Sequence, residues 1–417
     1  MTAEPESTVT LADVVAARER IAGLVRLTPL VDAVSLGERL GISLALKCEN
    51  LQRTGSFKPR GAANMLAAVP RPAGVVAASA GNHAQGVALA ARAHRLPITV
   101  VMPAAAPLAK RQATEGYGAG VVLADGPLAT AIAQARAMAE ERSLLFVPPY
   151  DNPYIVAGQG TVGLEILEQH PDVETVLVPA GGGGLLAGVA VAVKGLRPDV
   201  RVIGIQARAM PGIMESLTAG HPVAVPALHT LADGAGVAGP SALTLGLIER
   251  YVDDVVAVSE EAIAQAVLLL IERSRLIVEG AGALAIAALL TGAASPQGRT
   301  VAILSGGNID VNVLGQIVER GLVLEGRHRE LTIAAVNAPG EMARISRILA
   351  DAGANILTVD HDEVVHGLPL GVERLNFMLE VADNQAFERV MGALLAAGMQ
   401  RGTLTDLATP AAAAMPS

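Results

Sequence analysis

Short apolar runs of strand length alternate with longer helical patterns over most of this chain. Val75–Ala78 is followed by a helical pattern at Ala84–His94, and Ile98–Met102 by another at Leu108–Tyr117. The alternation returns from Thr175–Val178 onward. Because parallel strands need long crossover connections, usually helices, this rhythm favours mostly parallel sheets covered by helices. We therefore expect a doubly wound α/β fold.

Length and composition narrow the class of protein further. At 417 residues the chain exceeds what one hydrophobic core usually supports, so two or three domains are expected. Half of the residues (51%) are hydrophobic but only 2% are aromatic, which predicts an aliphatic core. The net charge of −9 and the lack of a long basic run argue against nucleic acid as a partner.

Three features bear on the compartment. The single cysteine, Cys48, excludes an internal disulfide and fits a reducing environment. Met1–Ser7 lack the basic-then-apolar pattern of a secretion signal. Thr175–Val193 is uncharged over roughly a membrane span, but Pro179 and four glycines indicate a strand, a loop and a buried helix. We expect a cytoplasmic protein that makes no membrane contact.

The C-terminal part has a different rhythm, which starts near residue 331. A strand, a helix, two strands, a second helix and a short strand form a βαββαβ unit of about 70 residues, the ferredoxin-like arrangement. We expect residues 325–330 to be a linker, 331–402 a separate domain and 403–417 a disordered tail. The longer expected elements are Leu331–Val336, Glu341–Ala352, Asn355–Val365, Gly371–Val381 and Gln385–Ala397.

One lysine stands out in the segment Thr54–Ala62, where Lys58 lies between Phe57 and Pro59. An amine nucleophile must be unprotonated, and partial burial beside an aromatic ring lowers the pKa of a lysine. Taken alone, the segment fits a solvated loop lysine equally well.

A second segment, Ser79–Gly86, follows the strand at Val75–Ala78. Its small residues would expose N–H groups where a helix begins, a position that suits a carboxylate. Asn82 offers both a donor and an acceptor. A plain serine N-cap would explain Ser79 but not the rest of the cluster.

A third segment, Gly181–Leu185, joins a predicted strand to a predicted helix. Four successive glycines let several amides point at one anion, and the helix dipole adds to the attraction. The glycines are not spaced as in a dinucleotide fingerprint, and no Walker lysine follows them. A phosphate without a nucleotide fits best, whereas the strong patterns on both sides argue against a flexible linker.

A fourth segment, Ser305–Asn308, follows the strand at Val301–Leu304 and supplies a neutral hydroxyl. Together the four segments offer an amine that can form an imine, a phosphate cradle, and an amide and a hydroxyl for a polar ring. Pyridoxal phosphate meets all of these demands.

On these motifs the chain resembles the fold-type II pyridoxal-phosphate enzymes over roughly residues 10–320, and among them the threonine dehydratases, also called threonine ammonia-lyases. The resemblance implies two doubly wound, mostly parallel sheet domains in residues 1–324, the smaller (roughly 55–150) inserted in the larger. Residues 331–402 resemble an ACT regulatory domain.

The resemblance also implies roles for individual residues. Lys58 would carry the cofactor as a Schiff base, Asn82 would contact the ring's 3-hydroxyl, and Ser305 would face the pyridine nitrogen. Glu279 matches an acidic position near the ring, although a carboxylate at a helix N-terminus explains it nearly as well. The implied cofactor-binding residues are Phe57, Lys58, Asn82, Gly181, Gly182, Gly183, Gly184, Leu185 and Ser305, and the implied substrate-binding residues, which act mostly through backbone groups, are Ser79, Ala80, Gly81, Asn82 and His83.

The implied reaction is β-elimination, which converts L-threonine to 2-oxobutanoate and ammonia and L-serine to pyruvate, in isoleucine synthesis or threonine catabolism. A neutral Ser305 cannot compensate a protonated pyridinium as an aspartate would, which suits prompt loss of a β-substituent better than transamination. Lys58 is expected to take the α-proton. The cofactor phosphate is the expected proton donor to the leaving hydroxyl.

Departures from related families separate the alternatives. Serine racemases of this type carry a second acid–base serine where this chain has Ala80. Their divalent-metal site begins with a glutamate and continues with an aspartate, where this chain has Gln206 and Gly212, so no metal is expected. Cysteine and threonine synthases have an acidic residue after the lysine, where Pro59 and Arg60 stand here. A 3-hydroxyaspartate dehydratase stays open as an alternative.

The C-terminal unit suggests regulation. By resemblance, an amino-acid effector, isoleucine or valine, would bind at the turn Asn337–Glu341 and near Asn355, across a homodimer or homotetramer. A purely structural dimerisation module is the alternative. An amino-acid sensor with weak catalysis, colourless when purified, is the non-enzyme alternative.

Overall fold

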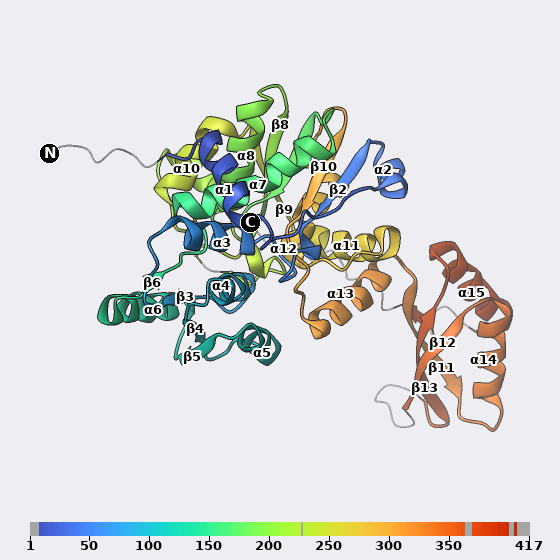
Figure 1. Cartoon of the computed structure of the whole chain (residues 1–417). Helices are drawn as coiled ribbons and strands as arrows, with labels where there is room; N and C mark the ends of the chain where they lie inside the picture. Colours follow the sequence, from blue (N-terminus) through green and yellow to red (C-terminus); the bar gives the residue numbers. More distant parts are fainter. Residues whose placement is uncertain (1–7, 227, 363–368, 400–403, 407–417) are drawn as a thin grey trace. The chain divides into compact units, whose positions relative to one another are not determined.

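The chain forms two units, and the computed structural model divides them between Val311 and Asn312. The structure describes residues 8–226, 228–362, 369–399 and 404–406 (Figure 1). Each unit has its own core of buried, mostly aliphatic side chains. Within the described ranges no helix is both long and apolar enough to cross a membrane.

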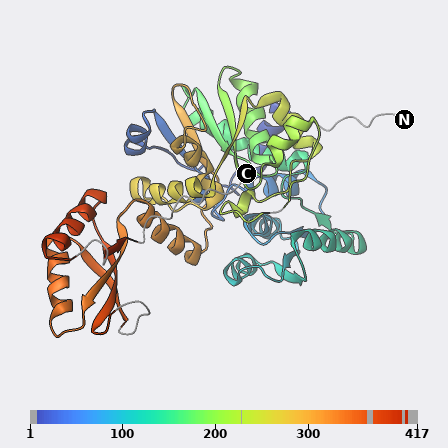
Figure 2. The same cartoon turned by 180° about the vertical axis from the view of Figure 1, so that it is seen from behind.

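The larger sheet of the first unit has six strands in the order β1-β2-β10-β7-β8-β9. All neighbours are parallel except β1, which runs antiparallel to β2 at one edge. Every residue of β7 and β10 is buried, as expected for parallel strands with helices on both faces (Figure 2). The strands are β1 (Leu30–Asp32), β2 (Leu44–Cys48), β7 (Thr175–Pro179), β8 (Arg201–Ala207), β9 (Asp254–Val258) and β10 (Thr300–Leu304).

Helices of this part pack closely because glycines face each other. A Cβ on Gly188 of α8 would lie 2.3 Å from the carbonyl oxygen of Val156 in α7, so the two helix backbones touch. The uncharged stretch Thr175–Val193 forms β7, a loop and most of the buried helix α8, as predicted. The helices are α1 (Leu11–Ile21), α2 (Val34–Leu40), α7 (Pro153–Gln169), α8 (Gly184–Leu196), α9 (Gly212–Ala219), α10 (Ala242–Tyr251), α11 (Glu260–Leu269) and α12 (Gly280–Leu290).

The chain leaves the larger sheet between β2 and β7 and builds a second, wholly parallel sheet in the order β5-β4-β3-β6. The prediction of parallel sheets with intervening helices is therefore confirmed. Helix α4 begins at Asn82, earlier than the predicted Ala84, which places Asn82 in its first turn. The elements are α3 (Pro59–Ala68), β3 (Val75–Ala78), α4 (Asn82–Ala93), β4 (Ile98–Pro103), α5 (Leu108–Gly116), β5 (Gly120–Ala124), α6 (Leu128–Arg142) and β6 (Leu145–Phe146).

Three short helical segments connect these elements: η1 (Glu49–Leu51), η2 (Asp233–Ala235) and η3 (Leu270–Ser274). Helix α13 (Val311–Leu324) follows β10 and belongs almost entirely to the second unit. The division between the two units therefore lies before residue 324, where we expected the catalytic region to end. The expected domain boundary at residue 324 stays a prediction.

The second unit contains an antiparallel sheet in the order β12-β13-β11-β14. Strand β11 begins at His328, inside the expected linker, because Glu380 on β13 continues the pairing to that residue. Residues 404–406 of the expected tail form β14, while 403 and 407–417 lie outside the described residues. The elements are β11 (His328–Val336), α14 (Glu341–Asp351), β12 (Asn355–Asp362), β13 (Val372–Glu380), α15 (Asn384–Ala396) and β14 (Leu404–Asp406), and residues 363–365 of the expected second strand also lie outside the described residues.

Candidate active site

A cavity of about 440 Å³ lies in the first unit, and its volume is typical of cofactor and small-ligand sites. Loops at the carboxyl ends of β3, β7 and β10 converge on it, which is where open α/β sheets bind ligands. All the cofactor-binding and substrate-binding residues named from the sequence line this cavity, and so does Glu279: Phe57, Lys58, Ser79, Ala80, Gly81, Asn82, His83, Gly181, Gly182, Gly183, Gly184, Leu185, Glu279 and Ser305.

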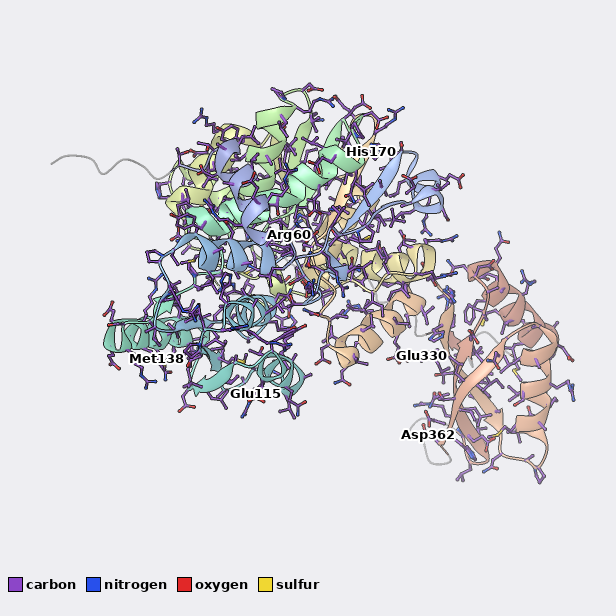
Figure 3. The ribbon with its side chains drawn as sticks, in the orientation of Figure 1. Arg60, Glu115, Met138, His170, Glu330 and Asp362 are labelled. Carbon is purple, nitrogen blue, oxygen red and sulfur yellow. The ribbon has the colours of Figure 1, made fainter. Side chains whose placement is uncertain are left out.

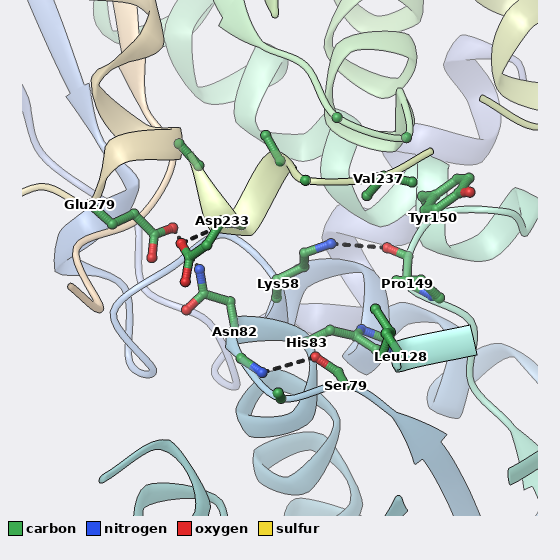
Figure 4. Close-up of a pocket in the computed structure, with 18 of the residues that line it drawn as sticks. Lys58, Ser79, Asn82, His83, Leu128, Pro149, Tyr150, Asp233, Val237 and Glu279 are labelled. Atoms are coloured by element: carbon green, nitrogen blue, oxygen red, sulfur yellow. Dashed lines mark hydrogen bonds between the residues drawn. The ribbon is translucent and has the colours of Figure 1, made fainter. Parts of the chain in front are cut away.

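Lys58 is the N-cap residue of α3, and its side chain enters the cavity (Figure 4). Nζ donates a hydrogen bond to the carbonyl oxygen of Pro149 at 3.1 Å. Burial lowers the pKa of Lys58 to about 8, against a smaller opposing effect of the Glu279 carboxylate. A substantial fraction of Lys58 is therefore unprotonated, and able to act as a nucleophile, at neutral to mildly alkaline pH.

The other lysines of the chain have carboxylate partners. Lys47 pairs with Glu165 at 2.6 Å, Lys110 with Asp233, and Lys194 with Asp253 at 2.8 Å. Lys58 is therefore the lysine whose nitrogen is best placed to act as a nucleophile. The solvated-loop interpretation of Lys58 is wrong, because the half-buried side chain lines a cavity and its amine bonds to a backbone carbonyl there.

Two neighbouring features fix the backbone at Lys58. Gly86 of α4 allows close approach, since a Cβ there would lie 2.9 Å from the carbonyl carbon of Lys58. The N–H of Phe57 donates to the carbonyl oxygen of Ser305 at 3.1 Å, which holds the lysine segment against the end of β10. The Phe57 ring centroid lies 5.1 Å from Lys58 Nζ.

A buried charge cluster holds the first turn of α3. Arg60, labelled in Figure 3, is fully buried and pairs with Glu49 at 2.8 Å and Glu165 at 2.6 Å. Glu165 also accepts a hydrogen bond from Lys47. Two cations and two carboxylates balance, and both carboxylates meet the guanidinium with two bonds each. Arg60 thereby ties the helix that begins just after Lys58 to η1 and α7.

Asn82 is held between two polar side chains. Its Nδ2 donates to Glu279 Oε1 at 2.6 Å, and its Oδ1 accepts from Asn308 Nδ2 at 2.7 Å. Asn308 also donates to the carbonyl oxygen of Thr54 at 2.7 Å. The orientation of the Asn82 amide, which lines the cavity, is therefore fixed.

Glu279 occupies the N-cap position of α12 but makes no capping hydrogen bond with its side chain. The carboxyl group turns instead toward Asn82 and the cavity (Figure 4). Burial, with repulsion from Asp233, raises the pKa of Glu279 to about 7. The alternative interpretation, in which the Glu279 carboxylate only caps a helix N-terminus, does not fit this geometry.

The glycine loop leaves no room for side chains. A Cβ on Gly182 would lie 2.5 Å from the Tyr150 ring, and one on Gly181 would lie 2.8 Å from the Ala235 carbonyl oxygen. Gly183 has φ +89°, which other residues rarely adopt. The first turn of α8 leaves its N–H groups without acceptors inside the helix. The loop is thus built to bring several N–H donors toward one anion, and it fits a phosphate group.

In the second segment, Ser79–Gly86, two polar side chains bond to backbone groups of the protein. Ser79 Oγ accepts from the Gly81 N–H at 3.1 Å, and His83 Nε2 lies 2.9 Å from the Val147 carbonyl oxygen. Burial, with the positive charge of Lys58, lowers the pKa of His83 to about 3, so the imidazole is neutral. A substrate carboxylate would therefore meet the backbone N–H groups at the start of α4, not these side chains.

Several lining residues were not identified from the sequence. Pro149 and Tyr150 lie between β6 and α7, Asp233 begins η2, and Lys110 lies on α5. The Tyr150 hydroxyl donates to the Gly239 carbonyl oxygen at 3.1 Å, which anchors the ring against the glycine loop. The Gly-containing turn at Asp233 was the one available signal.

The side chain of Gln206, near the end of β8, bonds to the backbone of the segment that follows this strand. Nε2 donates to the Met210 carbonyl oxygen at 3.2 Å, and Oε1 accepts from the Met214 N–H at 3.1 Å. Across the part of the chain that the structure describes, no three histidine, cysteine or acidic side chains are grouped as metal ligands.

Comparison with known proteins gives consistent matches. A family model described as pyridoxal-phosphate dependent enzyme matches residues 21–306. An L-threonine ammonia-lyase of Thermotoga maritima is 44% identical over 396 residues, which cover 94% of this chain and 98% of that protein. A solved threonine deaminase, from T.th., is 41% identical with a TM-score of 0.70, over 72% of this chain and 99% of that one. Maize serine racemase is 34% identical with a TM-score of 0.71, over 76% and 98%.

Proposed function

This chain belongs to the pyridoxal-phosphate-dependent enzymes, and from that premise we propose that it is an ammonia-lyase that converts L-threonine to 2-oxobutanoate and ammonia. L-Serine, which lacks only the γ-methyl group, would give pyruvate by the same steps. The observation that carries the proposal is one cavity that holds an amine with a lowered pKa, Lys58, together with a glycine cradle and no second acid–base side chain at Ala80.

The residues present fit the cofactor. Backbone N–H groups of Gly181–Leu185 would hold its phosphate, Asn82 its 3-hydroxyl and Ser305 its ring nitrogen. Lys58 would hold it covalently through Nζ. When bound, pyridoxal phosphate supplies an aldehyde that condenses with amines and a ring that withdraws electrons from the substrate's α-carbon.

Lys58 would remove the α-proton. With a pKa of about 8, its amine is partly unprotonated at neutral pH, and the unprotonated fraction grows as pH rises through that value. His83 cannot share this role, because a pKa lowered to about 3 makes its neutral ring a very weak base, and its Nε2 is bonded to the Val147 carbonyl. A base on a single face of the substrate's α-carbon supports elimination over racemisation, because racemisation needs an acid–base group on each face.

Loss of the β-hydroxyl follows. The α-proton and the β-hydroxyl leave together as water. Their loss creates a carbon–carbon double bond between Cα and Cβ. After release, the enamine gains a proton at Cβ and adds water at Cα, and ammonia departs. Ser305 offers no negative charge to the ring nitrogen, which supports prompt loss of the β-substituent over transamination.

Product analysis on the cofactor-loaded native protein tests the proposal. L-Threonine should give 2-oxobutanoate and ammonia in equal amounts, and L-serine should give pyruvate. L-Alanine, which has no β-hydroxyl to lose, is the matched control and should give neither. A cofactor-saturated protein that releases no ammonia from either hydroxy amino acid would exclude the lyase, and a protein that binds no cofactor would favour the sensor.

For the second unit we propose an ACT-like regulatory role, with isoleucine or valine as the effector. The support is its βαββαβ element order and the turn between β11 and α14, where Gly340 has φ +96°. Asn355 begins β12, shortly after α14 ends, and its Nδ2 donates to Glu380 Oε2 at 3.1 Å. We expect a homodimer or homotetramer. Isoleucine should change the KM for threonine in the whole chain and less so in Asn355→Ala, and an equal response in both would contradict this effector site.

A further inference from the structure

An ion pair connects the two sides of the cavity. Lys110 on α5 belongs to the part built around the four-stranded sheet, and Asp233 in η2 follows the larger sheet's strand β8. Both residues line the cavity, although they are far apart in the sequence. The Lys110 side chain is 19% exposed and that of Asp233 is 52% exposed, so the pair lies between the cavity and solvent.

The turn that carries Asp233 adjoins both ends of the proposed cofactor site. A Cβ on Gly234 would lie 3.2 Å from Glu279 Oε1, and the Ala235 backbone closely approaches Gly181. Figure 4 shows Asp233 next to Glu279 and Asn82. The ion pair therefore belongs to the wall that a bound substrate would face.

The charged residues along the cavity wall make Lys110 the cation that a second substrate carboxylate could meet. Among the described residues that line it, Lys58 and Lys110 are the lysines, none is an arginine, and His83 is neutral. Lys58 is committed to the cofactor, which leaves Lys110 as the cation available to a second substrate carboxylate. Asp233 already neutralises Lys110, and its own negative charge would repel such a carboxylate.

We propose that Asp233 is a specificity-determining residue. By neutralising (masking) the charge of Lys110, it favours 3-hydroxy amino acids with an uncharged side chain and excludes those with an acidic side chain. This inference rests on the elimination activity proposed above. It addresses the alternative left open by the sequence, because 3-hydroxyaspartate differs from threonine by a carboxylate in place of the methyl group.

Exchange of one carboxylate for an amide tests the proposal. In Asp233→Asn the amide oxygen can still accept the Gly234 N–H, which bonds Asp233 Oδ1 at 2.7 Å, so the turn should keep its form. The assay compares kcat/KM of the holoenzyme for L-threonine and L-threo-3-hydroxyaspartate. We expect the preference for threonine to fall at least about tenfold. Asp233→Ser, whose hydroxyl can also accept that bond, is the second variant.

Two further variants identify the group responsible. Addition of Lys110→Met to Asp233→Asn should abolish the gain with 3-hydroxyaspartate, since the unmasked cation is then absent. Glu115→Gln removes a carboxylate from the same helix, where Glu115 pairs with Arg111 at 2.9 Å outside the cavity, and should leave the preference unchanged.

The outcomes separate this inference from the proposed function. If Asp233→Asn and Asp233→Ser deaminate threonine but gain nothing with 3-hydroxyaspartate, the masking role is overturned while the lyase stands. A gain that persists without Lys110 also overturns it. Failure of the native protein to deaminate threonine would instead count against the proposed function.

Discussion

The buried charge cluster around Arg60 yields a quantitative prediction. Arg60 has no exposed surface and bonds Glu49 and Glu165, each with two bonds, so Arg60→Met leaves two buried carboxylates with Lys47 as their cation. Loss of one partner from a buried ion pair typically costs about 3–5 kcal/mol, because the remaining charge is left uncompensated. That is a large part of the about 5–15 kcal/mol by which most domains are stable.

Urea unfolding followed by far-ultraviolet circular dichroism measures the effect. With a slope of about 3 kcal/mol per molar, a cost of this size lowers the midpoint by about 1–1.7 M. The matched control is Arg18→Met, since Arg18 pairs with Glu168 on the surface (side chains 44% and 60% exposed) and should shift the midpoint by less than about 0.3 M.

A double variant distinguishes the unpaired charge from lost packing. Glu49→Gln added to Arg60→Met removes one of the stranded charges and should recover part of the lost stability, although each change alone is destabilising. Equal midpoint shifts for Arg60→Met and Arg18→Met, or a double variant less stable than Arg60→Met, would refute the reasoning.

Three further predictions follow from the cavity. Ala80→Ser should add serine racemisation, measured by chiral chromatography of residual serine, to an elimination activity that persists; absence of any D-serine would show that position 80 does not decide between the reactions. Gly182→Ala should weaken cofactor binding at least about tenfold, because the new methyl group would meet the Tyr150 ring at 2.5 Å, whereas Gly246→Ala, with nothing within 4 Å, should not; equal affinities in a fluorescence titration would contradict the cradle. Since the pKa of Lys58 is lowered to about 8, its free amine increases with pH, so the rate of cofactor capture by the apoprotein should reach half of its maximum near pH 8 and level off at higher pH; a rate still rising as steeply at pH 10 would mean that burial does not lower this pKa.

The sequence allowed prediction of the residues that follow strands. Lys58, Asn82, the glycine loop and Ser305 lie in segments of unusual local composition, and parallel strands bring their carboxyl ends to one edge. Boundaries were less accurate, since α4 begins two residues before the helical pattern at Ala84. Small polar residues are compatible with a first helical turn, so the apolar pattern alone could not detect it.

Other features depend on contacts between distant segments. Arg60 drew attention only as a non-acidic residue near the lysine, because nothing local indicates that Glu49 and Glu165 surround it. The Lys110–Asp233 pair likewise joins two elements, α5 and η2, that are far apart in the sequence. The position of Glu279 at a helix start could be predicted locally, but its side-chain direction could not, because the Asn82 amide determines it.

The most direct test of the central claim is identification of the residue that carries the cofactor. Borohydride reduction of the holoenzyme, followed by peptide mass mapping, reports which lysine bears a pyridoxyl group. The chain offers Lys47, Lys58, Lys110 and Lys194, so the result is unambiguous. We predict modification of the peptide that contains Lys58. A pyridoxyl group on any of the other three lysines, with Lys58 unmodified, would contradict the assignment of this cavity as the active site.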